Sequence, residues 1–122
     1  MLQRGTIFKV ADNSGAKVFK LIGTSGNSKI KTVGIGDVVT VAVNGASSVG
    51  VVKDHSIVQV LIVRTRKEVR RKDGSYVRFD DNAGVVIDKD GNMLATRVFG
   101  PIAREIRDAG YLKIASLAKE VW

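Results

Sequence analysis

The feature that most constrains this chain is the stretch of residues 58–87, which reads VQVLIVRTRKEVRRKDGSYVRFDDNAGVVI. It starts with an apolar run at 58–63, becomes basic at Arg64 and is apolar again by Val85. Between these ends lies the pair Asp73-Gly74. Such a pair between β-branched segments is a strong hairpin signal, because glycine accepts the positive φ that the turn needs. We therefore expect one long hairpin with its base in the core and its tip in solvent.

The middle of this hairpin, residues 64–78, is called the arm below. It holds seven basic residues against two acidic ones, and so carries +5 of the chain's formal net charge of +8. The seven are Arg64, Arg66, Lys67, Arg70, Arg71, Lys72 and Arg78. A projecting ribbon with this charge attracts polyanions, and we interpret it as a nucleic-acid-binding element. The alternative is a solvated charged ribbon without a partner.

The rest of the chain reads as short strands joined by turns. Glycine occurs 13 times in 122 residues and proline once. Expected strands recur at roughly ten-residue spacing, which indicates a mainly β protein built as a small barrel. They are expected at residues 7–10, 17–22, 38–43, 51–52, 58–63, 83–87 and 94–99, with a loop at 44–50. No repeat or linker divides the chain, so we expect a single domain over residues 1–122.

Only the end of the chain shows the hydrophobic spacing of helices rather than that of strands. Residues 102–109 are expected to form a helix with Pro101 in its first turn, and Gly110 then stands where a helix C-cap favours a left-handed residue. Residues 111–118 are expected to form a second short helix.

Composition argues against several classes of function. The chain has no cysteine and a single histidine, His55, so thiolate chemistry, His-based metal sites and catalytic triads lack their residues. Asp80 and Asp81 are neighbours that point to opposite faces of a strand, so we expect them to pair with arginines or cap the hairpin's return. We expect a non-enzymatic protein without cofactor or metal. No apolar run of about 18 residues and no signal-peptide block occur, so we expect a cytoplasmic protein without membrane contact.

The seven aromatic residues are scattered rather than gathered on one face. Phe8, Phe19 and Phe99 have apolar neighbours and are expected in the core. Tyr76, near the tip of the arm, is the one candidate for stacking on a base. Because cations greatly outnumber stacking candidates, the pattern favours phosphate neutralisation and shape recognition on a folded RNA.

Three segments carry a family resemblance: ADNSGAK at 11–17, VRTRKEVRRKDGSYVRFDDNA at 63–83 and TRVFGPIAREIR at 96–107. With them the chain closely resembles the bacterial type of the L-fourteen family of large-ribosomal-subunit proteins, over essentially its whole length. The resemblance implies a five-stranded β-barrel with a protruding ribbon and a small helical C-terminal region. It also implies binding to large-subunit rRNA, contacts with ribosomal proteins of the L-three and L-nineteen families, and a bridge to small-subunit rRNA at the subunit interface. The exposed face is where a ribosome-silencing factor docks in that family.

The charge pattern and the resemblance together define two sets of expected site residues. The expected rRNA-binding residues are Lys9, Asn13, Lys17, Lys29, Lys31, Arg64, Arg66, Lys67, Arg70, Arg71, Lys72, Tyr76 and Arg78. Thr96, Arg97 and Lys113 are expected to converge on one exposed patch, which by resemblance is the docking site of the silencing factor.

The chain departs from the family pattern at three places. Lys72 and Lys119 stand where the family usually has proline, and the second change is expected to let the last helix run on. Residues 44–56 are nearly neutral, with Lys53 as their only basic residue, which argues against RNA contacts by that loop. Two other functions remain open: a free single-strand-binding barrel, and an interaction module whose ribbon binds an acidic protein or a membrane surface.

Overall fold

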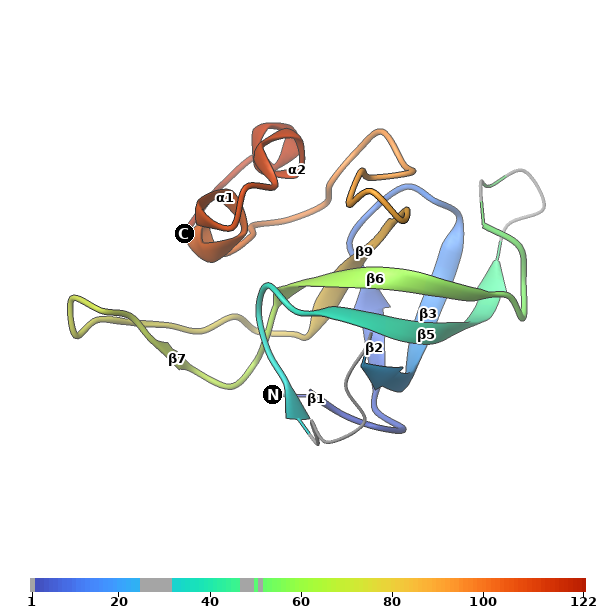
Figure 1. Cartoon of the computed structure of the whole chain (residues 1–122), viewed down its shortest axis with the longest axis horizontal. Coiled ribbons are helices and arrows are strands. Elements are labelled where there is room, and N and C mark those ends of the chain that lie inside the picture. The colour runs from blue at the N-terminus through green and yellow to red at the C-terminus, as the bar shows by residue number, and fades with distance from the viewer. Residues whose placement is uncertain (1, 25–31, 47–49, 51) are drawn as a thin grey trace.

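The computed structural model describes residues 2–24, 32–46, 50 and 52–122 (Figure 1). Its centre is a closed barrel of five strands, which confirms the predicted fold class. The barrel strands, in the order in which they pair, are β2 (Ile7–Val10), β3 (Ala16–Thr24), β5 (Val38–Ala46), β6 (Ile57–Arg64) and β9 (Ala83–Ile87). Neighbouring strands are antiparallel except for β9 and β2, which close the barrel in parallel with Lys9 opposite Ala83.

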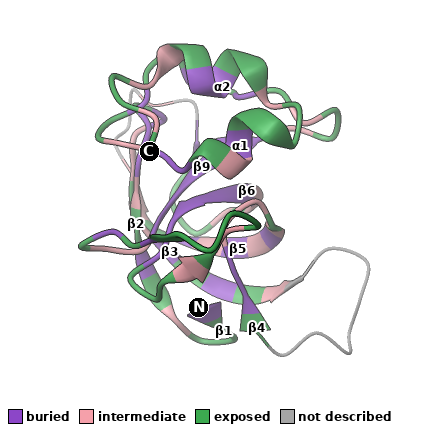
Figure 2. Cartoon of the chain, turned by 90° about the vertical axis from the view of Figure 1, so that its left-hand side faces the viewer, coloured by how far each residue is buried: buried purple, intermediate pink, exposed green. Residues whose placement is uncertain are grey.

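The barrel has two hydrophobic layers, one inside it and one outside. Phe8, Phe19 and Val41 pack inside the barrel with alternate residues of β6 and β9, such as Val60 and Val86. Side chains alternate across a strand, so the intervening residues of β6 and β9 face outward. That outward face is covered as well, and both strands are buried over most of their length (Figure 2). Burial on both faces accounts for their almost uninterrupted apolar sequence.

Two short helices supply the outer layer. They are α1 (Arg104–Asp108) and α2 (Leu112–Leu117). Ile106 of α1 and Ile114 of α2 share one buried cluster with Leu61 of β6 and Val85 of β9. The helical region is therefore packed on the barrel, as Figure 1 shows.

The first helix starts later than predicted. Ile102 forms a parallel bridge with Val121: its N–H donates to the carbonyl of Glu120, and its own carbonyl accepts from the N–H of Trp122. Ile102 is thus extended, and Pro101 lies outside the helix that begins at Arg104. Gly110 has φ +99°, as predicted for the residue after a helix end.

The second helix does not run on. Ala118 is already extended, with ψ 140°, so the helix ends before Lys119.

The expected strand at 94–99 is wrong. Only isolated bridges occur there, between Ile87 and Met93 and between Asp12 and Val98. The N–H groups of Thr96 and Arg97 both donate to the side-chain oxygen of Asn13, at 2.9 Å each, rather than to a neighbouring strand. Hydrogen bonds to the side chain of Asn13, which lies 83 residues before Thr96 in sequence, thus take the place of the main-chain hydrogen bonds that a strand would form here.

Three smaller predictions also need correction. β5 continues to Ala46, so residues 44–46 of the expected loop belong to a strand instead, and residues 47–49 lie outside the described part of the chain. Val52 is buried in a bend rather than in a strand, and residue 51 lies outside the described part of the chain. Phe8 and Phe19 are buried as predicted, but Phe99 is 52% exposed, because its backbone and not its ring faces the protein: its N–H donates to Ala11 and its carbonyl accepts from Arg64.

Candidate nucleic-acid interface

The arm is a hairpin, as predicted, but only a short part of it is regular ribbon. β7 (Val69–Arg70) pairs with β8 (Tyr76–Val77), and the chain projects to one side of the barrel (Figure 1). At the tip, the N–H of Gly74 donates to the carbonyl of Arg71, and Gly74 has φ +88°. This is a turn followed by a left-handed glycine, one of the common hairpin connections. The Asp73-Gly74 pair in the sequence therefore specifies where the chain turns back at the tip of the arm.

Two acidic residues stay ionised within the arm. A hydrogen bond from the Ser75 side chain, with another from its N–H, holds the pKa of Asp73 below its ordinary value. A hydrogen bond from the Lys67 ammonium group lowers the pKa of Glu68 in the same way. These two negative charges offset only part of the arm's seven positive charges, so the net charge of the arm stays positive.

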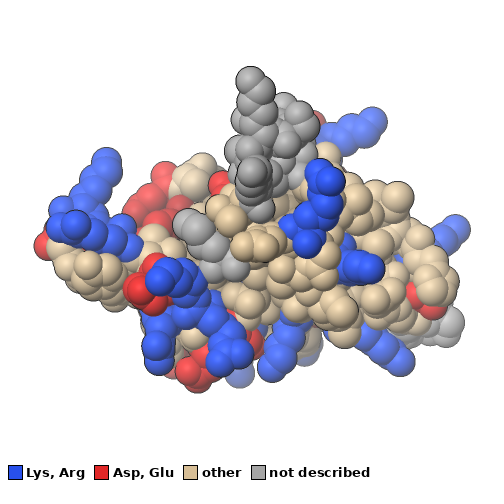
Figure 3. Space-filling model, turned by 90° about the horizontal axis from the view of Figure 1, so that it is seen from below, with Lys and Arg blue, Asp and Glu red and all other residues tan. Residues whose placement is uncertain are grey.

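Five cations of the arm are exposed: Arg66, Lys67, Arg70, Lys72 and Arg78. Lysine and arginine side chains gather on the arm and are more widely spaced over the barrel in the view from below (Figure 3). Lys67 forms an exposed ion pair with Glu68 at 2.9 Å, which is worth little in solution. Tyr76 is also exposed, at 63%. These residues present charge and one aromatic ring to solvent.

Arg64 is oriented differently from these five cations. Its side chain is only 9% exposed, and its Nε donates to Asp81 Oδ1 at 2.9 Å. Its Nη1 donates to the carbonyls of Phe99 and Pro101, at 2.7 and 3.1 Å. The expected pairing of Asp81 with an arginine is present. A guanidinium that binds these internal acceptors joins the barrel to the helical region.

Arg71 is also held within the protein. Its Nε donates to Glu105 Oε1 at 2.6 Å, and its Nη2 donates to the main-chain oxygen of Trp122. The ring of Trp122 in turn stacks on Phe79, which follows the arm. Val77 and Phe79 form a small buried cluster with Ala103, just before α1. These contacts fix the arm against the helical region.

The expected RNA contacts outside the arm fall into three groups. Lys9 and Lys17 are exposed on β2 and β3, and Lys9 lies 3.7 Å from Asp81. Asn13 is exposed, but its side chain binds the backbone of Thr96 and Arg97 and the Thr96 hydroxyl. Lys29 and Lys31 lie outside the described residues.

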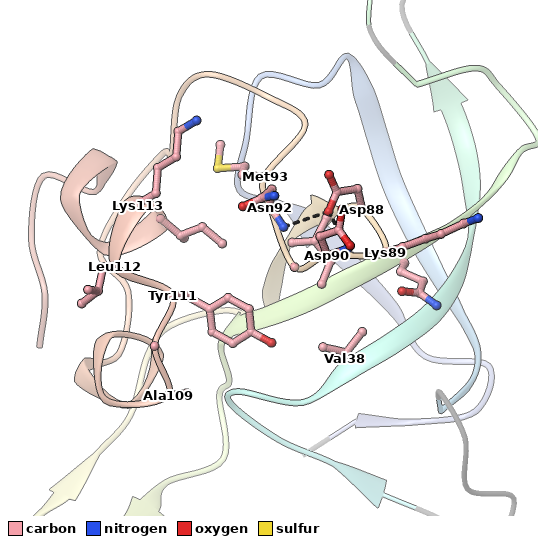
Figure 4. Close-up of a pocket in the computed structure, with 15 residues that line it drawn as sticks. Val38, Asp88, Lys89, Asp90, Asn92, Met93, Ala109, Tyr111, Leu112 and Lys113 are labelled. Atoms are coloured by element: carbon pink, nitrogen blue, oxygen red, sulfur yellow. Dashed lines mark hydrogen bonds between the residues drawn. The ribbon is translucent and has the colours of Figure 1, made fainter.

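The three residues of the expected docking patch come from two segments. Thr96 and Arg97 are exposed beside Asn13, and Lys113 is exposed on α2. Lys113 lines a hollow of about 550 Å³ together with Asn92 and Met93 (Figure 4). Met93 also belongs to the buried cluster that contains Ile114, so the two segments share a core beneath their exposed residues.

Sequence reasoning missed Trp122 and Glu105. Neither shows a pattern in the sequence that joins it to the arm, since Trp122 is 43 residues from Phe79 and Glu105 is 34 residues from Arg71. The described residues contain no group of three or more potential metal ligands. Nor does the described part of the chain include a helix long and apolar enough to cross a membrane.

Comparison with known proteins identifies the family. The whole chain, residues 1–122, matches the family described as Ribosomal protein L14p/L23e. The chain belongs to this family. Large ribosomal subunit protein uL14 of Petrotoga mobilis is 54% identical over 122 residues, which is 100% of both chains. The protein of the same name from Mesomycoplasma hyopneumoniae is 54% identical over 121 residues, 99% of each chain.

Membership of the L14p/L23e family decides the class of function. The chain is a structural, non-enzymatic protein of the large subunit of the cytoplasmic ribosome, with ribosomal RNA and ribosomal proteins as its partners. An arm with five exposed cations is consistent with that role.

Proposed function

We propose that the chain binds large-subunit rRNA chiefly through the exposed cations of its arm, with Lys9 and Lys17 on the barrel as further phosphate contacts. The observation that carries this proposal is the division of the arm's basic residues. Five point to solvent, whereas Arg64 and Arg71 bind acceptors within the protein. Exposed cations can neutralise phosphates and release counterions, and the exposed ion pairs of Lys67 with Glu68 and of Lys9 with Asp81 are weak enough to be exchanged for a phosphate. We accordingly leave Arg64, Arg71 and Asn13 out of the RNA-contacting set.

Tyr76 and the lysines at 29 and 31 complete the proposed RNA-binding set. Tyr76 is exposed beside Arg70, its partner across the ribbon. A ring in that place can stack on a base where the RNA offers an unpaired one. Lys29 and Lys31 are included from the sequence alone.

The family resemblance supports a more specific placement. We infer that the chain lies at the subunit interface, where it contributes to a bridge with small-subunit rRNA and contacts proteins of the L-three and L-nineteen families. Cross-linking of the chain within its native ribosome tests this placement. Cross-links confined to other proteins, or to RNA remote from the subunit interface, would contradict it.

The test of RNA binding uses three exposed cations of the arm. Arg66, Arg70 and Lys72 are replaced together by glutamine, and binding to large-subunit rRNA is measured over a range of salt concentrations. Each phosphate contact contributes about 0.7 to 0.9 to the slope of log affinity against log salt, so the slope should flatten by about 2 to 3 units. The matched control replaces Lys89, Arg107 and Lys119, which are exposed outside the proposed interface.

An unchanged slope in the arm variant, or equal effects of the two triple variants, would remove the arm from the RNA interface. Two further measurements, a salt wash of purified large subunits and RNase treatment, distinguish the two alternative functions. A free single-strand-binding barrel would leave purified large subunits in moderate salt. An acidic-protein or membrane module would keep its assemblies after RNase treatment.

The patch of Thr96, Arg97 and Lys113 is proposed as a protein-docking site for the ribosome-silencing factor, by family resemblance. Its support in the geometry is that both segments are exposed over one shared core. Arg97→Glu and Lys113→Glu should each weaken capture of the factor by purified large subunits, while the subunits keep their content of this chain. Rim charges act mainly on association rate and salt sensitivity, so the loss should be greatest at low ionic strength and shrink as salt screens the charges. Undiminished capture at full occupancy would refute the assignment.

A further inference from the structure

Trp122 presents an aromatic ring at the root of the arm that the proposed RNA interface does not use. One face of its indole lies on Phe79, with ring centroids 5.6 Å apart and an interplanar angle of 13°. Phe79 is 5% exposed, whereas Trp122 remains 48% exposed. Phe79 therefore covers one face of the indole, while about half of the Trp122 surface stays in solvent.

This indole is held rigidly. Its Nε1–H donates to Glu120 Oε2 at 2.8 Å, which fixes the rotation of the ring. The main chain of Trp122 pairs with that of Ile102, through an N–H···O bond of 2.8 Å. Binding to a ring that is already ordered costs less conformational entropy than binding to a mobile one.

The Trp122 ring borders a hollow that is lined by both charged and apolar residues. The hollow has a volume of about 250 Å³ and lies beside the stacked pair of Trp122 and Phe79. The rest of its lining is Gly100, Pro101, Arg78, Asp80 and the paired side chains of Arg64 and Asp81. That volume is below the roughly 300–1,000 Å³ of pockets for drug-sized ligands, and suits a single planar ring system. Arg78 is an exposed cation of the arm, and Asp80 is an exposed carboxylate at the same rim.

We propose that this hollow binds one unstacked nucleobase of the RNA that the arm holds, stacked on the exposed part of the Trp122 ring. The proposal rests on the proposed RNA-binding function and adds a base-binding site to it. Arg78 can hold the phosphate of the same nucleotide. Asp80 repels phosphates but accepts hydrogen bonds from the N–H groups of a base, so the base rather than the backbone enters the hollow.

The test uses the chain's single tryptophan. Trp122 fluorescence is recorded during titration of the full chain with large-subunit rRNA, together with its quenching by acrylamide. A base stacked on the indole should quench the emission saturably and reduce access of acrylamide to the ring. Both effects should follow the same binding curve as complex formation measured by filter binding.

Substitution of the ring gives the second measurement. Trp122→Leu should weaken RNA binding about 5- to 150-fold, as expected for loss of one stacked base, while the salt slope stays unchanged because no phosphate contact is lost. Trp122→Phe, which keeps an aromatic ring, should recover much of the affinity. Both variants preserve the main-chain contacts to Arg71 and Ile102, and their denaturation midpoints verify that they are folded.

The outcomes separate this inference from the proposed function. If the wild-type chain binds the rRNA but its emission and acrylamide access stay unchanged, the base-binding site is refuted and the arm remains the interface. If the wild-type chain binds no rRNA, the proposed function itself fails. If the indole becomes protected only in assembled subunits and never by rRNA alone, a protein covers it and the inference is overturned.

Discussion

Replacing Arg64 tests whether this residue joins the two parts of the molecule rather than binding RNA. Arg64→Met removes the guanidinium but keeps most of the apolar stem. Asp81 then loses its bidentate partner, and the carbonyls of Phe99 and Pro101 lose their donor. Removing one member of a buried ion pair costs about 3–5 kcal/mol. Asp81 is 27% exposed and keeps Lys9 at 3.7 Å, so the lower end, about 3 kcal/mol, applies.

The assay is urea denaturation of the full chain. With an m-value of about 2 kcal/mol/M, a loss of about 3 kcal/mol lowers the midpoint by about 1.5 M. Arg66→Met is the matched control, because Arg66 is a cation of the same arm whose side chain is exposed. Its effect should stay within about 0.5 kcal/mol. Adding Asp81→Asn to Arg64→Met should restore part of the loss, because the unpaired carboxylate is no longer present.

The salt dependence of RNA binding completes this test. If Arg64 contacted a phosphate, its removal would flatten the salt slope by about 1 unit. We expect no change in slope under conditions where the variant is folded. A variant as stable as the wild type, or one with a flatter slope and an unaltered midpoint, would refute the structural role of Arg64.

Three further predictions concern backbone conformation, and a fourth concerns the pKa of Asp73. Gly100 has φ +79°, and a Cβ there would meet the Arg64 guanidinium, so Gly100→Ala should lower the free energy of unfolding by about 1–3 kcal/mol in denaturation. Gly74→Val should strain the arm's tip by a similar amount, about 1–3 kcal/mol, with faster amide exchange confined to the arm. Lys72→Pro should leave the denaturation midpoint unchanged or raise it, because residue 72 is the second residue of a turn closed by the Gly74 N–H and the Arg71 carbonyl. Ser75→Ala should raise the pKa of Asp73 toward its ordinary 3.8 in an NMR titration; the stabilisation from this depressed pKa is present above that value and is lost as pH falls through the folded-state pKa.

Local sequence signals were sufficient where each segment's contacts are set by its own residues. Residues 7–10 and 83–87 form strands with the predicted bounds, because β-branched and aromatic residues there are enclosed by turn-forming ones. The reversal at Asp73-Gly74 follows in the same way from the glycine's positive φ. The five-stranded closure, in contrast, came from family resemblance. No local pattern specifies that β9 pairs with β2.

Prediction failed where a distant side chain or main chain determines the local structure. The segment at 94–99 is irregular because Asn13 accepts its N–H groups. Helix α1 starts late because residues near 121 pair with Ile102. For the same reason the sequence did not reveal the internal ion pairs of Arg64 and Arg71, since a run of cations does not show which of them meets Asp81 or Glu105 in the fold.

The internal contacts of the arm order its backbone, and this affects how the five exposed cations are presented to a ligand. An isolated two-stranded hairpin is at best marginally stable in water, and the regular part of this arm comprises only two residue pairs. Without tertiary contacts, each exposed cation would have to be positioned when RNA binds, at about 0.5–1.5 kcal/mol per ordered side chain, in addition to the cost of ordering the backbone. The ion pair between Arg71 and Glu105, and the cluster of Val77 and Phe79 against Ala103, meet the backbone part of that cost during folding. Under the proposed function, Arg71 therefore contributes to RNA affinity indirectly, by ordering the ribbon that presents the exposed cations.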